Sequence, residues 1–476
     1  MPLMSRLPVY ALLALLVVAP VAPAAAADGL PRPVITALAN HQLNGSGVSV
    51  FVQAVDADEP LLAFNEHVAR SPASIVKVLT SYAALDLLGP NYRWQTEVWV
   101  DGPVRDGRLE GNLILRGGGD PGLTTERFWT LLREIRARGI TEIAGDLVVD
   151  DALFAPNGER PGDFDQQPYR AYNVLPNALL INNNAVEFRV MRAGSGVRLY
   201  VDPPLDGFRV QNHITTRQGS CTGFQRGVAI ELPDSFEGQH AILSGAFPSA
   251  CNEFSLWRSV LPAPEYANAL FRSLWRQLGG RIEGGFRTAP VPAGARRIYS
   301  HPSLPLAEQL RTINKWSNNP MTRHLFLTLG LEHGGPPATL EKGRAAVAAW
   351  FEQRGLYMPG LFIDNGSGLS RRTRVTAAGF GTMLLDAWQH PQMAELISSM
   401  PISAVDGTLH RRYRGDMAGR MYLKTGRLKN VSAIAGTVLS ESGRRYAVVV
   451  IVNAPDAEGG AGIAVQDAVL RWVFSQ

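Results

Sequence analysis

The N-terminal part of the chain passes from short apolar runs separated by polar turns to one long apolar segment. Val48–Val52 has the alternation of a strand, and a polar turn at 56–60 separates it from the apolar run Leu61–Phe64, so the two runs predict a hairpin. From Pro72 to Gly89 the chain is apolar on nearly every side of a helix. A surface helix keeps a polar face, so we predict a buried central helix here.

The C-terminal part repeats the strand-rich pattern. We expect strands at Arg420–Leu423, Ala433–Leu439 and Tyr446–Val452, followed by a closing helix at about 463–474. The apolar stripe of that helix is compatible with a membrane surface, but at the end of a sheet such a stripe is more typical of core packing.

The middle of the chain has a different pattern of apolar and polar residues. Residues 93–296 hold many short strand-like runs separated by Gly, Pro and Asn turns, with helical pieces at about 125–138 and 264–278. The clearest strand-like runs are Asn112–Arg116, Asp146–Val149 and Glu187–Val190. We therefore expect residues 93–296 to be an inserted region of two lobes, within a discontinuous domain made of residues 28–92 and 297–476.

The composition is that of a globular protein of two or three domains. The 476 residues are 46% hydrophobic, which is enough for a large core. The 46 basic and 42 acidic residues give a formal charge of +4, a balance that does not indicate nucleic-acid binding. Only five lysines accompany 41 arginines. Each retained lysine therefore marks a position that favours a compact ammonium able to lose its proton.

The first 27 residues have the layout of a cleavable secretory signal. Arg6 precedes an apolar run at Leu12–Val18, and Ala25–Ala27 supplies small residues before a cut at Ala27/Asp28. Prolines interrupt the apolar run short of the roughly 20 residues that a membrane span needs. We expect an exported protein without an integral membrane anchor, and therefore a disulfide between its two cysteines, Cys221 and Cys251. Two buried thiols are the alternative.

Three short motifs carry the chemistry. They occur in the order Ser74-Ile75-Val76-Lys77, Ser317-Asn318-Asn319 and Lys424-Thr425-Gly426, and they match the SxxK, SxN and KTG set of penicillin-recognising serine enzymes. From the composition, the joint chance expectation is roughly 0.007.

The spacing of the first motif suits nucleophilic catalysis. Ser74 and Lys77 lie one helical turn apart on the same face. A serine hydroxyl needs an adjacent base, and a buried lysine beside a second cation, Lys424, can lose its proton and serve as that base. Gly426 leaves room for a substrate backbone beside the strand. The structural alternative makes Ser74 a helix cap and both lysines solvated charges.

Other motifs give no second function. The run Gly117–Asp120 lacks the ending of a P-loop and is predicted to be a turn. Tyr266-Ala267-Asn268 resembles a β-lactamase motif, but it falls in an amphipathic helix where Tyr266 is expected in the core. The nine histidines show no ligand spacing, so we predict no catalytic metal and no cofactor.

The chain resembles the class C low-molecular-mass penicillin-binding proteins, the D-alanyl-D-alanine carboxypeptidase/endopeptidase family. The resemblance runs through the whole mature chain, and the 243 residues from Ser74 to Ser317 match the large insert of this family. Besides the three motifs, it includes LRGGGDPGL at Leu115–Leu123, GDLVVDDALF at Gly145–Phe154, DNGSGLSR at Asp364–Arg371 and DGTL at Asp406–Leu409.

The resemblance implies an α/β (α+β) fold: a penicillin-binding-protein/β-lactamase-like transpeptidase domain, with an antiparallel sheet and a helical lobe, from which a large β-rich insert projects. It also implies catalytic roles. Ser74 is the acylated nucleophile, Lys77 its general base, Ser317 the relay of the proton to the leaving amine, and Lys424 the residue that helps to set the proton balance.

The same resemblance implies the substrate-binding residues. Asn319 holds the amide on the acyl side, and Lys424 and Thr425 attract the terminal carboxylate beside Gly426. The backbone N–H groups of Ser74 and Arg427 form the oxyanion hole. Arg427 replaces the usual Ser or Thr after KTG, so a second carboxylate-binding hydroxyl is missing there. Its guanidinium either recruits the carboxylate or narrows the cleft.

The implied function is a periplasmic serine DD-peptidase acting on peptidoglycan stem peptides. It cleaves D-Ala-D-Ala termini, D-Ala–diaminopimelate cross-links, or both, and β-lactams acylate and inhibit it. Two alternatives remain: a non-catalytic protein that binds or scaffolds the wall and keeps the fold, and a β-lactamase. The large insert argues against the second, and the complete set of motifs argues against the first.

Overall fold

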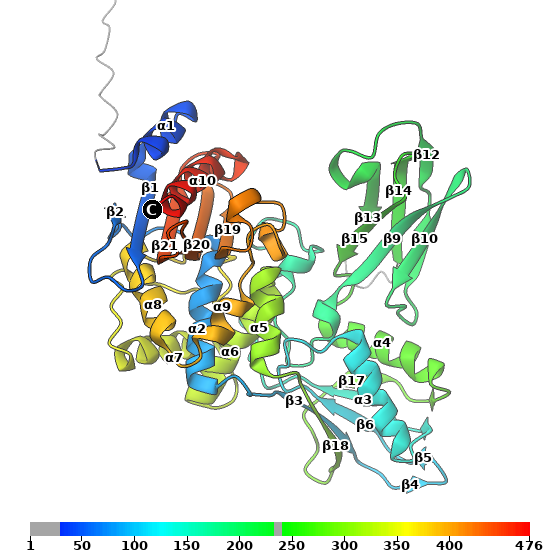
Figure 1. Cartoon of the computed structure of the whole chain (residues 1–476). Coiled ribbons are helices and arrows are strands. Elements are labelled where there is room, and N and C mark those ends of the chain that lie inside the picture. The colour runs from blue at the N-terminus through cyan, green and yellow to red at the C-terminus, as the bar shows by residue number, and fades with distance from the viewer. Residues whose placement is uncertain (1–28, 233–239) are drawn as a thin grey trace, which may run out of the picture.

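The structure is a computed structural model that describes residues 29–232 and 240–476. The predicted secretory signal lies outside these residues. Figure 1 shows a body of helices and one large sheet, from which a separate β-rich part projects. No helix within the described ranges is long and apolar enough to cross a membrane.

Both ends of the chain build the main sheet. Its order is β19-β20-β21-β1-β2, and every neighbouring pair is antiparallel. The strands span Val48–Ala54 (β1), Leu62–Phe64 (β2), Met421–Leu428 (β19), Val431–Leu439 (β20) and Arg445–Asn453 (β21). The predicted hairpin and the three predicted C-terminal strands are confirmed.

Helices cover both faces of this sheet. Alternate side chains of a strand point to opposite faces, and in β1 Val50 and Val52 join one core whereas Phe51 joins the other. The helices α1 (Arg32–Asn40) and α10 (Ala461–Phe474) pack over the first face. Residues of α10 such as Val469 are fully buried there, so its apolar stripe is core, as predicted.

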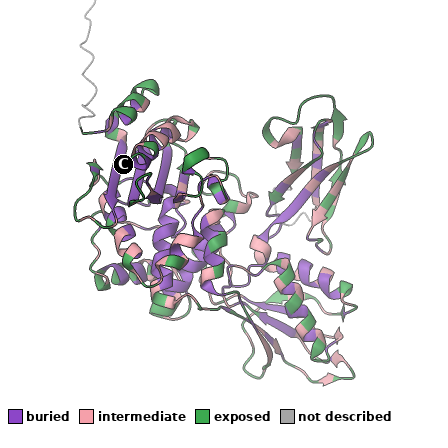
Figure 2. Cartoon of the chain, in the orientation of Figure 1, coloured by how far each residue is buried: buried purple, intermediate pink, exposed green. Residues whose placement is uncertain are grey.

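A helical lobe covers the second face and surrounds α2 (Val76–Leu88). Every residue of α2 from Val76 to Leu85 is buried, so the predicted central helix is confirmed. Figure 2 shows it as a purple rod among its neighbours. Those neighbours are α5 (Leu306–Lys315), α6 (Asn319–Gly334), α7 (Leu340–Gln353), α8 (Ala377–Gln389) and α9 (Met393–Ser399).

The middle of the chain folds around a core of its own, drawn from residues 98–275. One sheet, in the order β17-β8-β6-β3-β18, carries the helices α3 (Thr125–Ala137) and α4 (Ala263–Gln277), and Tyr266 is in the core as predicted. Its strands are β3 (Gln95–Val100), β6 (Leu113–Arg116), β8 (Leu147–Asp150), β17 (Phe286–Thr288) and β18 (Arg296–Pro302). The inserted region was predicted to end at residue 296, whereas β18 keeps the chain in this sheet as far as Pro302. The domain boundaries remain a prediction.

Smaller sheets complete this region. One, in the order β16-β7-β5-β4, consists of two-residue strands: Val104–Arg105 (β4), Arg108–Leu109 (β5), Glu142–Ile143 (β7) and Arg281–Ile282 (β16). The outermost part holds β9 (Val186–Ala193), β10 (Gly196–Asp202), β11 (Arg209–Asn212), β12 (Thr215–Arg217), β13 (Val228–Glu231), β14 (His240–Pro248) and β15 (Glu253–Arg258). Cys221 and Cys251 form the expected disulfide there.

Candidate active site

Ser74 lies on a short 3-10 turn, Ala73–Ile75, that leads directly into α2. The turn begins with Ala73 at a φ of 46°, a left-handed conformation that costs energy in a non-glycine residue. Lys77 follows in the first turn of α2, and its Nζ lies 3.0 Å from Ser74 Oγ. The pair is therefore assembled by the helix itself, at the spacing that the motif predicts.

Lys77 is fully buried and has three hydrogen-bond partners. Besides Ser74 Oγ, its Nζ donates to Asn319 Oδ1 at 2.7 Å and to the carbonyl of Ser367 at 2.5 Å. Burial, and then the charge of Lys424, lower the pKa of Lys77 well below the usual lysine value. A neutral amine can donate to the amide and the carbonyl and still direct its lone pair at the Ser74 hydroxyl. That arrangement suits a general base.

Lys424 on β19 is the second fully buried lysine of the site. Its Nζ donates to Ser317 Oγ and to the carbonyl of Thr425, each at 2.8 Å. Burial lowers the pKa of Lys424 to about 7. Neither lysine is a solvated charge, so that structural alternative is wrong. Burial lowers the pKa of both lysines, and the charge of Lys424 further favours the neutral form of Lys77.

The SxN segment sits where α6 begins. The side chain of Asn318 accepts a hydrogen bond from the N–H of Met321 and caps the helix, and Pro320 in the first turn favours helix initiation. Ser317, just before the cap, has a φ of 58°. Asn319 is the first helical residue, and its Nδ2 donates to the carbonyl of Tyr172 at 3.3 Å.

The KTG segment lies on β19, which is one of the two edge strands of the main sheet. A Cβ at Gly426 would stand 2.7 Å from the carbonyl oxygen of Pro72 and 3.0 Å from the nitrogen of Ser74. Glycine therefore lets the strand approach the turn that bears Ser74. The guanidinium of Arg427, in contrast, donates to the carbonyl of Glu458 at 2.6 Å.

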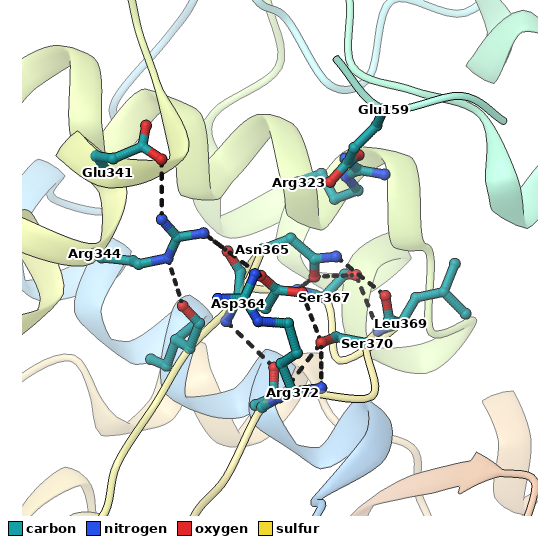
Figure 3. A network of polar contacts seen from close by, with 12 residues as sticks. Glu159, Arg323, Glu341, Arg344, Asp364, Asn365, Ser367, Leu369, Ser370 and Arg372 are labelled. Carbon is teal, nitrogen blue, oxygen red and sulfur yellow. Dashed lines mark hydrogen bonds and ion pairs between the residues drawn. The ribbon is translucent and has the colours of Figure 1, made fainter. Parts of the chain in front are cut away.

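The carbonyl that Lys77 contacts belongs to a loop held by polar contacts (Figure 3). Asp364 accepts from the Ser370 hydroxyl at 2.7 Å, and the side chain of Asn365 accepts from both the N–H and the hydroxyl of Ser367. The guanidinium of Arg344 donates to the carbonyl of Asp364 at 3.0 Å. These bonds fix the direction of the Ser367 carbonyl.

The same loop touches the nucleophile turn through Gly368. We expect Gly368→Ala to lower the free energy of unfolding by about 3 kcal/mol or more, because its φ is 77° and a Cβ would lie 2.0 Å from the carbonyl oxygen of Ala73. Denaturant unfolding measures the change. Gly415→Ala is the matched control, since its φ is 70° with no atom within 4 Å of the added Cβ, and it should cost about 1–2 kcal/mol. Equal losses in the two variants would contradict the close contact.

The structure brings the three motifs together. Lys77 of the first motif is hydrogen-bonded to Ser74 and to Asn319 of the second motif, and Lys424 of the third motif is hydrogen-bonded to Ser317 of the second. Sequence reasoning assigned no role to three other contacts. The carbonyls of Ser367 and Tyr172 accept from Lys77 and Asn319, and the hydroxyl of Thr408 accepts from Thr425. The glycine-rich DNGSGLSR run and the DGTL run before KTG were signals for Ser367 and Thr408, whereas Tyr172 had none.

Known proteins resemble this chain along most of its length. The profile of the D-Ala-D-Ala carboxypeptidase 3 (S13) family matches residues 32–474. The D-alanyl-D-alanine carboxypeptidase of an Actinomadura species is 30% identical over 454 residues, covering 91% of this chain and 82% of that protein. The crystal structure of penicillin-binding protein 4 from Haemophilus influenzae superposes with a TM-score of 0.75 at 24% identity, covering 90% of this chain and 96% of that one. Its complex with a β-lactam gives 0.72 at 23%, covering 93% and 99%.

Proposed function

Because this chain belongs to the D-Ala-D-Ala carboxypeptidase 3 (S13) family, we propose that Ser74 is acylated by peptidoglycan stem peptides and releases their terminal D-Ala. The observation that carries the proposal is the contact of 3.0 Å between Ser74 Oγ and the amine of a fully buried Lys77. A hydroxyl gains reactivity when a base of matched pKa lies within hydrogen-bond distance.

Acylation begins with transfer of the Ser74 proton to Nζ of Lys77. The oxygen then bonds to the carbonyl carbon of the penultimate D-Ala, and the backbone N–H groups of Ser74 and Arg427 stabilise the oxyanion. The bond to the leaving amine breaks as that amine takes a proton from Ser317, which Lys424 contacts at 2.8 Å. Ser317 in turn receives the proton that Lys77 took from Ser74, so Lys77 is a free base again before water enters. Water, activated by the same base, then cleaves the ester and restores the Ser74 hydroxyl.

Substrate binding follows from the position of β19 at an edge of the main sheet, where residues 401–403 bond only to its first half, Met421–Leu423. A peptide that lies along an edge strand gains backbone hydrogen bonds, and the close approach at Gly426 brings that strand beside Ser74. Asn319 holds the acyl-side amide. The charge of Lys424 and the hydroxyl of Thr425 attract the terminal carboxylate of the stem.

A cavity of about 200 Å³ beside the Ser367 loop supports activity on diaminopimelate-containing stems and cross-links. Ser370 and Arg371 of the loop line it together with Glu159 and Asp163, and Glu159 is paired with Arg323. A diaminopimelate side chain ends in an ammonium and a carboxylate, which such a mixed set of charges can pair. The cavity therefore supports binding of diaminopimelate-containing stems, both those that end in D-Ala and those that are cross-linked to a second stem.

The proposed compartment is the periplasm, because the predicted secretory signal would deliver the enzyme to the wall. β-Lactams are the proposed covalent inhibitors. They present a reactive carbonyl and a carboxylate to the same groups, and a protein of the same fold is known in complex with one.

The experiment is digestion of two purified muropeptides by the mature protein. A pentapeptide stem should lose one D-Ala, and a dimer joined through D-Ala–diaminopimelate should become two monomers, each detected by mass. The release of D-Ala alone would limit the enzyme to carboxypeptidase activity. Tight binding of both muropeptides without any product would contradict the proposal and favour the non-catalytic wall-binding protein.

A further inference from the structure

We propose that the hydroxyl of Thr408 binds the C-terminal carboxylate of the substrate together with Thr425. The inference rests on the proposed function, because it adds a specificity-determining residue to the same site. It answers a question that the sequence leaves open: how the carboxylate is held when the position after KTG carries Arg427 and no hydroxyl.

The two threonines form a pair of hydroxyls at the surface of the site. Thr425 Oγ1 donates to Thr408 Oγ1 at 2.9 Å, and Thr408 is exposed. A threonine hydroxyl has one proton and two acceptor lone pairs. Within the described part of the chain the proton of Thr408 meets no acceptor, so the pair offers at least one unused donor. An incoming carboxylate oxygen can accept a hydrogen bond from the Thr408 hydroxyl. After rotation of the Thr425 side chain, the carboxylate can accept a second hydrogen bond from the Thr425 hydroxyl.

Arg427 does not compete for this position. Alternate residues of a strand share a face, so Thr425 and Arg427 lie on the same side of β19. The Arg427 guanidinium is engaged by the carbonyl of Glu458, whose carboxylate in turn accepts from the N–H of Asn430 at 2.6 Å. Thr408 therefore supplies, from a neighbouring turn, the hydroxyl that Arg427 lacks.

The turn that bears Thr408 is fixed before any substrate binds. Asp406 accepts from the N–H of Ile402 at 2.8 Å through one oxygen and from Nζ of Lys315 at 2.5 Å through the other. Gly407 has a φ of 55°, and a Cβ there would lie 2.6 Å from the carbonyl oxygen of Lys315. A donor that is already held in place loses little conformational entropy when the ligand binds. Little of the free energy of its hydrogen bond to the carboxylate is therefore lost to ordering the turn.

The contacts of Asp406 also link the turn to the catalytic centre. Lys315 ends α5 two residues before Ser317, and its Nζ contacts both Asp406 and the carbonyl of Met400. The turn and the SxN segment are therefore held to one another, and the Thr408 hydroxyl keeps its place relative to Ser317 and Lys424.

The test compares wild type with Thr408→Val on a peptide ending in D-Ala-D-Ala and on the same peptide with a C-terminal amide. Valine keeps the shape of threonine and removes the hydroxyl. A hydrogen bond to a charged group has the strength to change kcat/KM by about tenfold, so we expect that loss on the acid, mainly through KM, and less than about a twofold change on the amide. Thr130→Val, on α3 in the inserted region, is the matched control.

Rescue separates binding from a merely structural role. Adding Arg427→Ser to Thr408→Val restores a hydroxyl beside Thr425 and should recover most of the activity on the acid. Equal losses on acid and amide, an unchanged KM, or no rescue would overturn the inference. A wild type that cleaves neither peptide would instead contradict the proposed function. Thr408 is then tested by the ratio of acylation rates with benzylpenicillin and its methyl ester, which should fall about tenfold in Thr408→Val.

Discussion

Replacing Ser74 with alanine is expected to lower the rate of D-Ala release by about 10⁴-fold or more. The change removes one oxygen, the atom that forms the ester, while the fold should persist because Ser74 does not cap α2 and lies in a turn whose backbone is held by its neighbours. The measurement is steady-state release of D-Ala from a pentapeptide stem, with substrate binding measured separately.

The matched control is Ser475→Ala, whose exposed hydroxyl contacts only the carbonyl of Trp472 at the end of the chain. It should leave turnover unchanged. If Ser74→Ala kept the rate of wild type, another group would be the nucleophile and the proposed acyl-enzyme would be wrong. Preserved binding without turnover is the outcome that isolates the chemical step.

Replacing Lys77 with methionine should lower the acylation rate by about 10³-fold or more, because the base is removed while its length and packing are nearly retained. Lys77→Arg should not restore the rate, since a guanidinium holds its proton at all working pH values. Acylation by benzylpenicillin, followed by stopped assay and intact mass, measures both variants. Lys429→Met, at an exposed lysine beyond KTG, is the control.

The pH profile of wild type gives the same prediction a second readout. Acylation needs Lys77 without its proton, and the lowered pKa of Lys77 places that rise below the usual lysine range. It also needs the charge of Lys424, whose pKa is about 7, so the rate should fall as the pH rises through that value. The result is a bell, and Lys77→Met should lose its rising limb. A rate in wild type that climbs only near the pKa of free lysine would contradict the account.

Local pattern was enough to predict much of the catalytic domain. The apolar positions of α2 surround the helix, and that is the pattern of a buried element wherever it occurs. The Ser74–Lys77 contact depends only on helical spacing, so it too follows from four consecutive residues. The strands β20 and β21 are long, rich in β-branched residues and separated by a clear turn.

What escaped prediction depends on distant parts of the chain. The carbonyls of Ser367 and Tyr172 are backbone groups, and a backbone acceptor leaves no signature in the residue type that carries it. The position of Thr408 depends on Asp406 and Lys315 meeting across 91 residues. The role of Arg427 could not be predicted for the same reason. Its guanidinium donates a hydrogen bond to the carbonyl of Glu458, which lies 31 residues further along the chain.

The measurement that tests the central claim most directly is intact mass of the mature protein after incubation with benzylpenicillin, followed by peptide mapping. The account predicts one stable adduct of the mass of the drug, located on the peptide that contains Ser74 and missing from Ser74→Ala. An unmodified protein with the drug intact, or an adduct on any other residue, would contradict it.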